Sequence, residues 1–376
     1  MILYPIWSQT PIGIVVGGSM SDGKGRRVAI AVFAIVVMIL AYFFVCTEPL
    51  SAELSAVPRW RIDIAATAET ALPAGESVEG LLSYSTDTRH GYFWPDGRVA
   101  FMADEPAAIS DKSYVIPSRN GSGSMLKVPG KPAGLPIEAH LPFFAADKLY
   151  SAELDGSGFA AWDQSGRKSW SYAFPCQLSA FSAGDTLAVG GTVDGWLEGV
   201  TVDGRKAFSF APGGSRLSVI LGLGVSRSGD WIAAISGIDR QRLVVLGRGG
   251  ADFRVTSHRY LDSDYREPVR VIVMSDDRHV LYRRTDGIGV WSVDGKVDEV
   301  LPVKADDFDV HADGERGLAY LVARRGRKSE IVVFRLPATL LGRISLPDSS
   351  DYVRFVGSSA YVGGRTWLAR FDFVEG

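Results

Sequence analysis

Short apolar runs alternating with polar turns make up most of the chain. From about residue 56 onward, runs rich in Val, Ile, Leu, Phe, Tyr and Trp each end at Gly, Asp or Ser, with no amphipathic helical pattern between them. Ser-Gly or Asp-Gly pairs separate consecutive runs at residues 165–166, 203–204 and 294–295. Such pairs are typical of tight β-hairpins, because glycine adopts the positive φ that these turns need. The pattern predicts an all-β domain built from hairpins.

The hairpins recur with a regular period. A polar turn followed by an apolar strand recurs at intervals of roughly 36 to 51 residues. These turns lie at Asp96, Asp147, Asp185, Asp230, Asp277, Asp313 and Ser358. Repeats of about 40 to 50 residues with four strands each are typical of propeller blades. Seven units of about 46 residues fill residues 60–376, so the sequence predicts a seven-bladed β-propeller.

The last unit appears one strand short. It offers only Tyr352–Val356, Ala360–Gly363 and Trp367–Phe373. A propeller must close its ring, because an open strand edge invites aggregation. The missing strand is expected from the N-terminal side, from either Trp60–Ala65 or Glu79–Ser85, and the first of these is preferred.

An uncharged apolar run covers residues 28–45 near the N-terminus. At about 1.5 Å per residue it would span roughly 27 Å, close to a hydrocarbon core. Lys24, Arg26 and Arg27 precede it, and positive charge stays on the cytoplasmic side. The sequence therefore predicts a cytoplasmic segment (1–27), a transmembrane helix (28–46), a linker (47–59) and an extracytoplasmic, periplasmic propeller (60–376).

Other interpretations of the N-terminal region stay open. Cleavage after a small residue near Ala52 or Ala56, or lipidation at Cys46, would also place the large domain outside the cytoplasm. Residues 1–19 are too broken to span a membrane. Translation from Met20 would place a compact basic segment directly before the apolar run, so we expect Met20 to be the true start.

The amino-acid composition excludes several classes of function. Hydrophobic residues make up 46% of the chain and the formal charge is -3, whereas a nucleic-acid-binding domain should be clearly basic. Two cysteines and five histidines are too few for a zinc module or a disulfide framework. Nucleophile-elbow, zinc-protease, P-loop and dinucleotide motifs are all missing from the sequence. We therefore expect no catalytic residues, no cofactor and no nucleic-acid partner.

One short acidic stretch has the residue types of a calcium site. Alternation along an inner strand would place Asp307, Asp309 and His311 on one face, where oxygen ligands could hold calcium. The position at which a calcium-binding loop needs a bidentate Glu is Tyr320. A solvated strand and turn is the preferred interpretation, without a metal.

Basic residues recur in the loops that join second and third strands. Such loops share one face of a propeller, and the corresponding loops of earlier units are acidic at Asp104, Glu105, Asp155 and Asp194. One half of this face is therefore expected to be positive. These residues are either ordinary solvated hairpin tips or a surface that binds an acidic envelope protein, or an anionic polymer or lipid. The predicted partner-binding residues are Arg240, Arg242, Arg283, Arg284, Arg324, Arg325, Arg327, Lys328 and Arg365.

The hairpin at residues 162–170 resembles known propeller repeats. Trp162–Asp163 and the turn after it are similar to the dipeptide of WD40-like repeats, and Gly166 to Trp170 is similar to a stretch of quinoprotein-like blades. The resemblance covers about residues 60–376, and it implies a β-propeller. Propellers of this kind in the bacterial envelope are often non-enzymatic scaffolds.

The sequence thus predicts a membrane-anchored, non-catalytic scaffold for envelope proteins. A propeller that senses a small molecule or glycan in its channel mouth is one alternative. A propeller-type lyase or hydrolase is the other.

Overall fold

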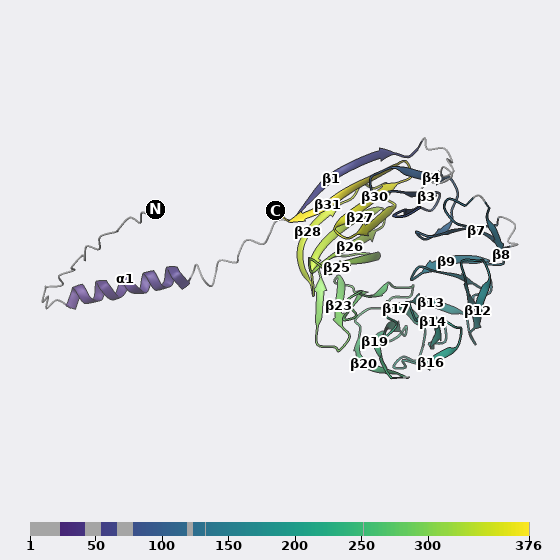
Figure 1. Ribbon diagram of the computed structural model, residues 1–376. Coiled ribbons are helices and arrows are strands. Elements are labelled where there is room, and N and C mark those ends of the chain that lie inside the picture. Colours follow the sequence, from purple (N-terminus) through teal and green to yellow (C-terminus); the bar gives the residue numbers. More distant parts are fainter. Residues whose placement is uncertain are drawn as a thin grey trace, which may run out of the picture. The chain divides into compact units, whose positions relative to one another are not determined.

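Eight β-sheets arranged in a ring form the larger of two compact parts of the chain (Figure 1). The two parts are Met1–Glu53 and Leu54–Gly376, and each is considered by itself. A computed structural model describes residues 23–41, 54–65, 78–118, 123–131, 133–250 and 252–375.

The first part contributes one helix, α1 (Gly23–Ala41). The described helix stops at Ala41, so its apolar portion is shorter than the predicted membrane span of residues 28–46. Within the described residues, no helix combines the length and apolarity needed to cross a bilayer, and the prediction of an N-terminal transmembrane helix is therefore wrong. The cytoplasmic placement inferred from Lys24, Arg26 and Arg27 stays a prediction. The envelope location stays a prediction. The predicted start at Met20 and the lipidation considered at Cys46 fall on residues outside the described ranges.

We number the blades along the chain. Blade 1 contains β2 (Leu82–Ser85), β3 (His90–Phe93) and β4 (Val99–Ala103). Blade 2 contains β5 (Ala108–Ile109), β6 (Tyr114–Pro117), β7 (Ser124–Lys127) and β8 (Leu135–Ile137). Blade 3 contains β9 (Leu141–Ala145), β10 (Lys148–Ala152), β11 (Gly158–Trp162) and β12 (Lys168–Ala173). Blade 4 contains β13 (Leu178–Ala183), β14 (Leu187–Thr192), β15 (Leu197–Thr201) and β16 (Lys206–Phe210).

The second half of the ring follows the same order. Blade 5 contains β17 (Ile220–Val225), β18 (Trp231–Ser236), β19 (Arg242–Gly249) and β20 (Asp252–Tyr260). Blade 6 contains β21 (Val271–Val273), β22 (His279–Arg283), β23 (Ile288–Ser292) and β24 (Asp298–Leu301). Blade 7 contains β25 (Asp307–Asp313), β26 (Leu318–Arg325), β27 (Lys328–Arg335) and β28 (Thr339–Ser345). Blade 8 combines β29 (Tyr352–Val356), β30 (Ser359–Gly364) and β31 (Trp367–Glu375) with β1 (Leu54–Asp63).

The ring has eight blades, so the prediction of seven is wrong. The error lies at the start of the domain, where residues 82–137 form two short blades instead of one. Asp96 marks a turn between β3 and β4, whereas Asp230 and Asp277 mark turns between the first and second strands of their blades. The first turn of blade 2 is at Asp111, after a strand of only two residues. An average repeat length cannot reveal blades this short.

Blade 1 lacks an inner strand among the residues that the structure describes. In four blades the turn before the outermost strand packs against the outermost strand of the preceding blade: Gly97 against Trp60, Gly166 against Ile137, Gly204 against Trp170 and Gly295 against Ser257. A Cβ at Gly204 would lie 2.6 Å from the Cβ of Trp170, so only glycine fits this contact. Gly97 makes this contact from the turn between β3 and β4, so β4 is the outermost strand of blade 1. β3 and β2 therefore occupy the positions of its third and second strands.

Among the described residues, side chains of blades 2 and 8 cover the open edge of β2. The N–H of Ser83, on the open edge of β2, donates to the Asp111 carboxylate over 2.9 Å, and its carbonyl accepts from the Tyr352 hydroxyl over 2.8 Å. Arg354 donates to both oxygens of Asp111, each over 2.5 Å. The outward backbone groups of Ser83 are therefore both satisfied.

The ring closes between the two ends of the domain, as predicted. β1 pairs antiparallel with β31, from Leu54 opposite Glu375 to Asp63 opposite Trp367. This confirms the preference for the segment around Trp60 over Glu79–Ser85 as the closing strand. It also places the start of the propeller at Leu54, inside the segment predicted as a linker.

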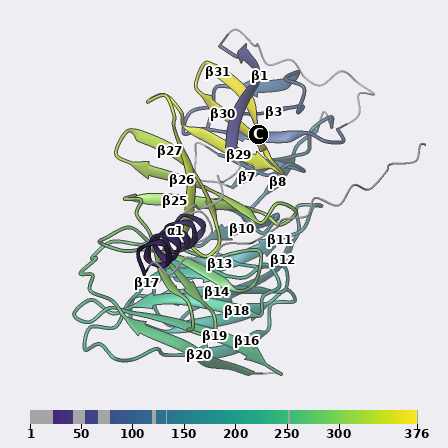
Figure 2. The same cartoon turned by 90° about the vertical axis from the view of Figure 1, so that its left-hand side faces the viewer.

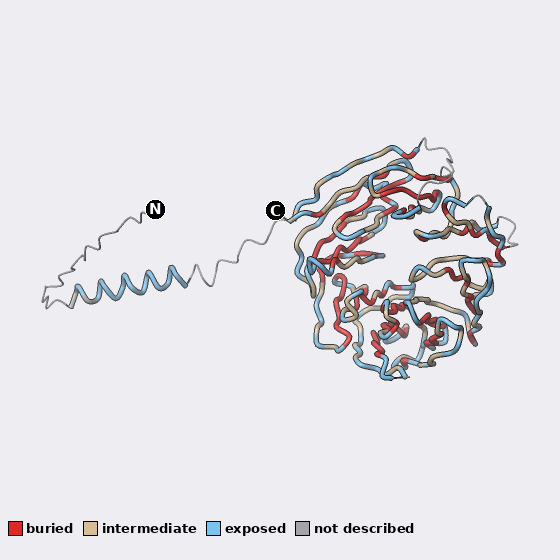
Figure 3. Tube along the Cα trace, viewed as in Figure 1, coloured by how far each residue is buried: buried red, intermediate tan, exposed pale blue. Residues whose placement is uncertain are grey.

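The core consists of apolar layers between neighbouring blades. Figure 3 shows buried residues concentrated in the middle strands, and every residue of β14 and β18 except Trp231 is buried. The layer between blades 3 and 4 is aromatic, with Phe159 and Phe181 ring centroids 4.7 Å apart in edge-to-face geometry. Such pairs add about 0.5 to 1.5 kcal/mol beyond the burial of their area.

A buried carboxylate joins blades 3 and 4 near the outside. Glu198 accepts from Lys206 over 2.7 Å, from Tyr172 over 2.8 Å and from Ser209 over 3.0 Å. Burial would raise the pKa of the Glu198 carboxyl, but these three donors lower it overall. Burial and the Glu198 carboxylate together raise the pKa of Tyr172 to about 12.

Replacing Glu198 by Ala is expected to destabilise the domain by about 2 kcal/mol, because it leaves partly buried donors without an acceptor. Chemical denaturation monitored by tryptophan fluorescence would measure this change. Ser209→Ala, which removes only one donor, is the matched control and is expected to cost less than half as much. Equal stability of the Glu198→Ala variant and the unaltered protein would contradict the assignment.

Candidate partner-binding face

One face of the ring carries all the predicted partner-binding loops. Each complete blade is an antiparallel meander, so its second–third turn and its connection to the next blade emerge at the same end. We call this end the inter-blade face. Arg240 precedes β19, Arg284 follows β22, and Arg365 lies between β30 and β31, so the predicted residues do share this face. The remaining ones are Arg242, Arg283, Arg324, Arg325, Arg327 and Lys328, all at or beside second–third turns.

Three of these arginines, Arg283, Arg284 and Arg324, are neutralised by nearby carboxylates. Arg283 lies 2.8 Å from Glu267 and 3.7 Å from Asp306. Arg284 donates to both oxygens of Asp286, over 2.8 and 2.9 Å, and these hydrogen bonds to the carboxylate raise the pKa of Arg284 above its ordinary value. The predicted continuous positive half-face therefore does not exist around blade 6.

Two further stretches of the predicted positive half are also occupied. The guanidinium of Arg240 lies 3.8 Å from the ring centroid of Tyr260, and Arg242 donates to the carbonyl of Pro212 over 3.1 Å. Arg324 lies 3.4 Å from Asp307. These contacts hold the loops of blade 5 and the Arg324 end of blade 7 in place.

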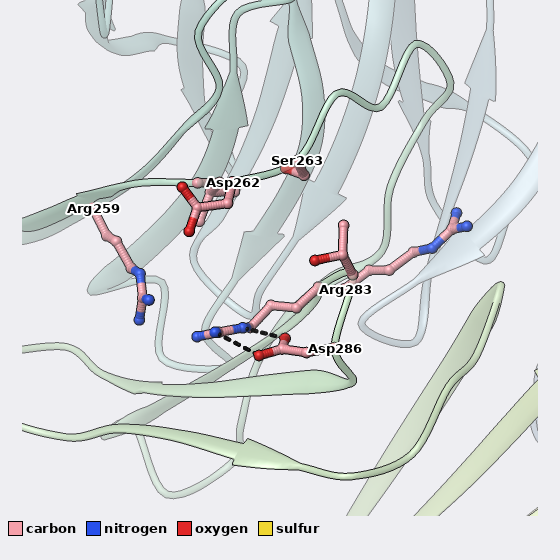
Figure 4. Close-up of a pocket in the computed structure, with 8 residues that line it drawn as sticks. Arg259, Asp262, Ser263, Arg283 and Asp286 are labelled. Atoms are coloured by element: carbon pink, nitrogen blue, oxygen red, sulfur yellow. Dashed lines mark hydrogen bonds and ion pairs between the residues drawn. The ribbon is translucent and has the colours of Figure 1, made fainter.

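A small cavity between blades 5 and 6 illustrates this local neutrality. Figure 4 shows Arg259, Asp262, Ser263, Arg283 and Asp286 around it. Its volume of about 70 Å³ is small, and its cations already have carboxylate partners. We therefore assign it a structural role in joining the two blades.

The acidic loops of the face are similarly engaged. Asp155 accepts from the N–H and the hydroxyl of Ser157, and Asp194 accepts from the Thr192 hydroxyl over 2.5 Å, so both stabilise their own turns. Asp104 lies 2.8 Å from Arg89, whose side chain is almost fully buried. Asp104 and Glu105 lie in the connection between blades 1 and 2, not in a second–third turn.

A larger pocket on blade 7 keeps unpaired cations. Its volume is about 620 Å³, and Lys304, Arg325, Lys328 and Arg343 line it together with Glu330 and Asp348. No ion pair within the described ranges involves Lys304, Arg325 or Lys328, in contrast to Arg283, Arg284 and Arg324. We call these residues with Ala323, Ser345 and Leu346 the cationic pocket.

The cationic pocket exists because blade 7 outgrows blade 6. Ala319, Leu321 and Ala323 on β26 pack into the apolar layer shared with blade 6, and Arg325 continues the same strand face. β26 and β27 have eight residues each, whereas β22 and β23 have five. The end of the blade 7 sheet therefore lacks cover from blade 6. Cross-strand pairing of Arg325 with Lys328 places both side chains on this uncovered face.

The channel side of the ring holds a second sizeable pocket, of about 580 Å³. Asp309 and His311 line it, whereas Asp307 is engaged with Arg324. Burial lowers the pKa of His311. Throughout the described part of the chain, no group of three or more His, Cys, Asp or Glu side chains could hold a metal ion.

Comparison with known proteins agrees with the ring of sheets. The profile of a family described as "beta-propeller protein" matches residues 21–376. This chain belongs to that family. An uncharacterised protein of Treponema pallidum (strain Nichols) is 23% identical over 353 residues, which is 89% of this chain and 92% of the relative. Neither description names a catalytic activity.

Solved structures show the same fold at low identity to this propeller family member. BamB from Moraxella catarrhalis matches with a TM-score of 0.58 and 14% identity, covering 85% of this chain and all of that one. The computationally designed Ika8 protein gives 0.59 and 15%, over 82% and 98% of the two chains. The WD40 domain of Toxoplasma gondii coronin gives 0.51 and 14%, over 87% and 88%. The resemblance to WD40-like repeats is thereby confirmed at the level of fold.

Proposed function

We propose that this β-propeller is a non-catalytic scaffold that binds an acidic segment of a partner protein in the cationic pocket of blade 7. The single observation that carries the proposal is the contrast among the cations of the inter-blade face. Arg283, Arg284 and Arg324 have carboxylate partners, whereas Arg325, Lys328 and Lys304 surround a pocket of about 620 Å³ without one. Unpaired cations beside an apolar floor favour an anionic ligand with some apolar surface.

The pocket also has the composition of a docking site. Ala323 and Leu346 are buried at its base, and the charged groups stand around them. Two residues of the pocket, Lys304 and Arg343, were not among the predicted ones, because one comes from an inter-blade connection and the other from an outer strand. A search restricted to second–third turns could not have found them.

Replacing both Arg325 and Lys328 by Glu is expected to reduce recovery of the bound protein from crosslinked cell extracts by about tenfold or more, since like charges would then face the partner. Affinity purification with quantitative mass spectrometry would measure it. Arg205→Glu is the matched control, because Arg205 is highly exposed in the turn between β15 and β16 at the other end of the blades. Unchanged recovery with the double variant, alongside an unchanged melting temperature, would contradict the proposal.

A further inference from the structure

The outer edge of β28 borders the cationic pocket. β28 is the last strand of the blade 7 sheet, with β27 on one side only. The N–H of Leu346 donates to the carbonyl of Ser329, so these two residues form a hydrogen-bonded pair between β28 and β27. Hydrogen-bonded and non-hydrogen-bonded pairs alternate along an antiparallel ladder, so Ile344 and Ile331 form the next hydrogen-bonded pair. The backbone N–H and C=O of Arg343 and Ser345 therefore point away from β27.

These outward groups have no partner in the part of the chain that the structure describes. No backbone hydrogen bond of Arg343 or Ser345 is found there, and both residues are exposed. An edge of this kind is a template for a further strand unless another element covers it. Figure 2 shows blade 7 with β25, β26 and β27 side by side.

The side chains of the same two residues line the cationic pocket. Arg343 and Ser345 are two positions apart, so their side chains lie on one face of the sheet. Ser345 is opposite Glu330, and Glu330 is opposite Ala323, which places the open edge and the pocket floor in one continuous surface. A strand added beside β28 would direct every second side chain toward Arg325, Lys328 and Lys304.

We propose that the partner segment is an extended acidic peptide that adds to blade 7 as a fifth strand along β28, with alternate carboxylates in the cationic pocket. This inference rests on the proposed function and specifies how the partner binds. Backbone hydrogen bonds to Arg343 and Ser345 supply affinity that is independent of sequence, and the pocket selects for acidic side chains at every second position.

Fluorescence anisotropy on the full chain tests the proposal with a labelled seven-residue peptide of alternating Glu and Val, matched to the length of β28. Ser345→Pro removes one outward N–H from an edge where proline is tolerated, and it is expected to weaken binding by about tenfold. Ser345→Ala keeps the N–H and is the control, with binding expected within about twofold. Arg325→Glu with Lys328→Glu is expected to abolish binding.

A second measurement does not depend on the folding of a variant. Two N-methylated forms of the peptide, one methylated at every Glu and one at every Val, are compared on the unaltered protein. Only one set of N–H groups can face β28, so one form is expected to lose binding and the other to keep it. Equal binding of both forms, or of Ser345→Pro and the unaltered protein, would overturn strand addition. The scaffold proposal would still stand in that case if the variant with both Arg325→Glu and Lys328→Glu lost its partner protein.

Discussion

Chains that begin after β1 are expected to lose the folded ring as a whole and not only one blade. β1 supplies the outer strand of blade 8 and also contacts blade 1, where the Trp60 indole donates to the carbonyl of Pro95 over 3.1 Å. The carbonyl of the buried Ile64 accepts from Arg89 over 2.7 Å. Loss of these contacts is expected to cost about 5 kcal/mol or more, comparable to the whole stability of a domain.

Two truncated chains that differ only by this strand measure the effect. A chain that starts at Leu54 keeps β1, and one that starts at Ala65 lacks it. Circular dichroism and urea denaturation are expected to show the unaltered transition for the first and no cooperative transition for the second. A chain that ends after Arg365 lacks β31 and should behave like the second. If the chain without β1 melted like its longer counterpart, the ring would not depend on this closure.

Removal of Asp111 is expected to destabilise the domain by about 2 to 3 kcal/mol. Its carboxylate accepts two hydrogen bonds from Arg354, one from the Ser83 N–H and one from the Ser83 hydroxyl, so Asp111→Ala removes four hydrogen bonds at the open edge of β2. Urea denaturation of the variant would measure the loss. Asp203→Ala, which breaks an exposed ion pair with Arg205, is the control and is expected to change stability by less than about 0.5 kcal/mol.

The Asp111 contribution also depends on pH. Burial would raise the pKa of the Asp111 carboxyl, but the hydrogen bonds and charge of Arg354, together with Ser83, hold it below the ordinary value. A carboxyl with a lowered pKa stabilises the folded state above the ordinary value of about 4, and this stabilisation is lost as the pH falls through the lowered value. The difference in stability between Asp111→Ala and the unaltered protein should therefore shrink in acid. A constant difference from pH 7 to pH 2.5 would contradict this account.

The strands of the ring could be predicted from hydrophobic alternation and glycine turns. The observed β29 spans the predicted Tyr352–Val356, and the predicted strand Trp367–Phe373 lies within β31. Closure by the segment around Trp60 followed from counting strands, because a three-stranded last unit needs a fourth. These inferences held because each depends on residues that are near in sequence or on a requirement of the whole ring.

The number of blades could not be predicted in the same way. β5 has two residues, too few for any periodic signal, and the described part of blade 1 has three strands. The open edge of β2 is covered by Asp111, Tyr352 and Arg354, which come from two other blades. Such contacts between distant segments leave no pattern in the local sequence, so a uniform repeat length concealed the extra blade.

The position of the predicted basic residues on the ring could be predicted from the sequence, but the pairing of their charges could not. All nine predicted residues lie at second–third turns, as topology requires. The carboxylates that neutralise Arg283 come from the connections on either side of blade 6, at Glu267 and Asp306. Pairing between segments far apart in the sequence decides which cations stay free, and only the folded ring shows it.

The closing sheet joins the first strand of the domain to the last, and this has a consequence for synthesis. β1 leaves the ribosome before every other strand, and its partner β31 is made after all of them. During that interval Pro58, which lacks an N–H, and the charges of Arg59 and Arg61 make the waiting strand a poor template for stray pairing. We expect the capture of this early-made strand by the late-made β31 to be a slow step of folding, because the two strands are separated by almost the whole domain.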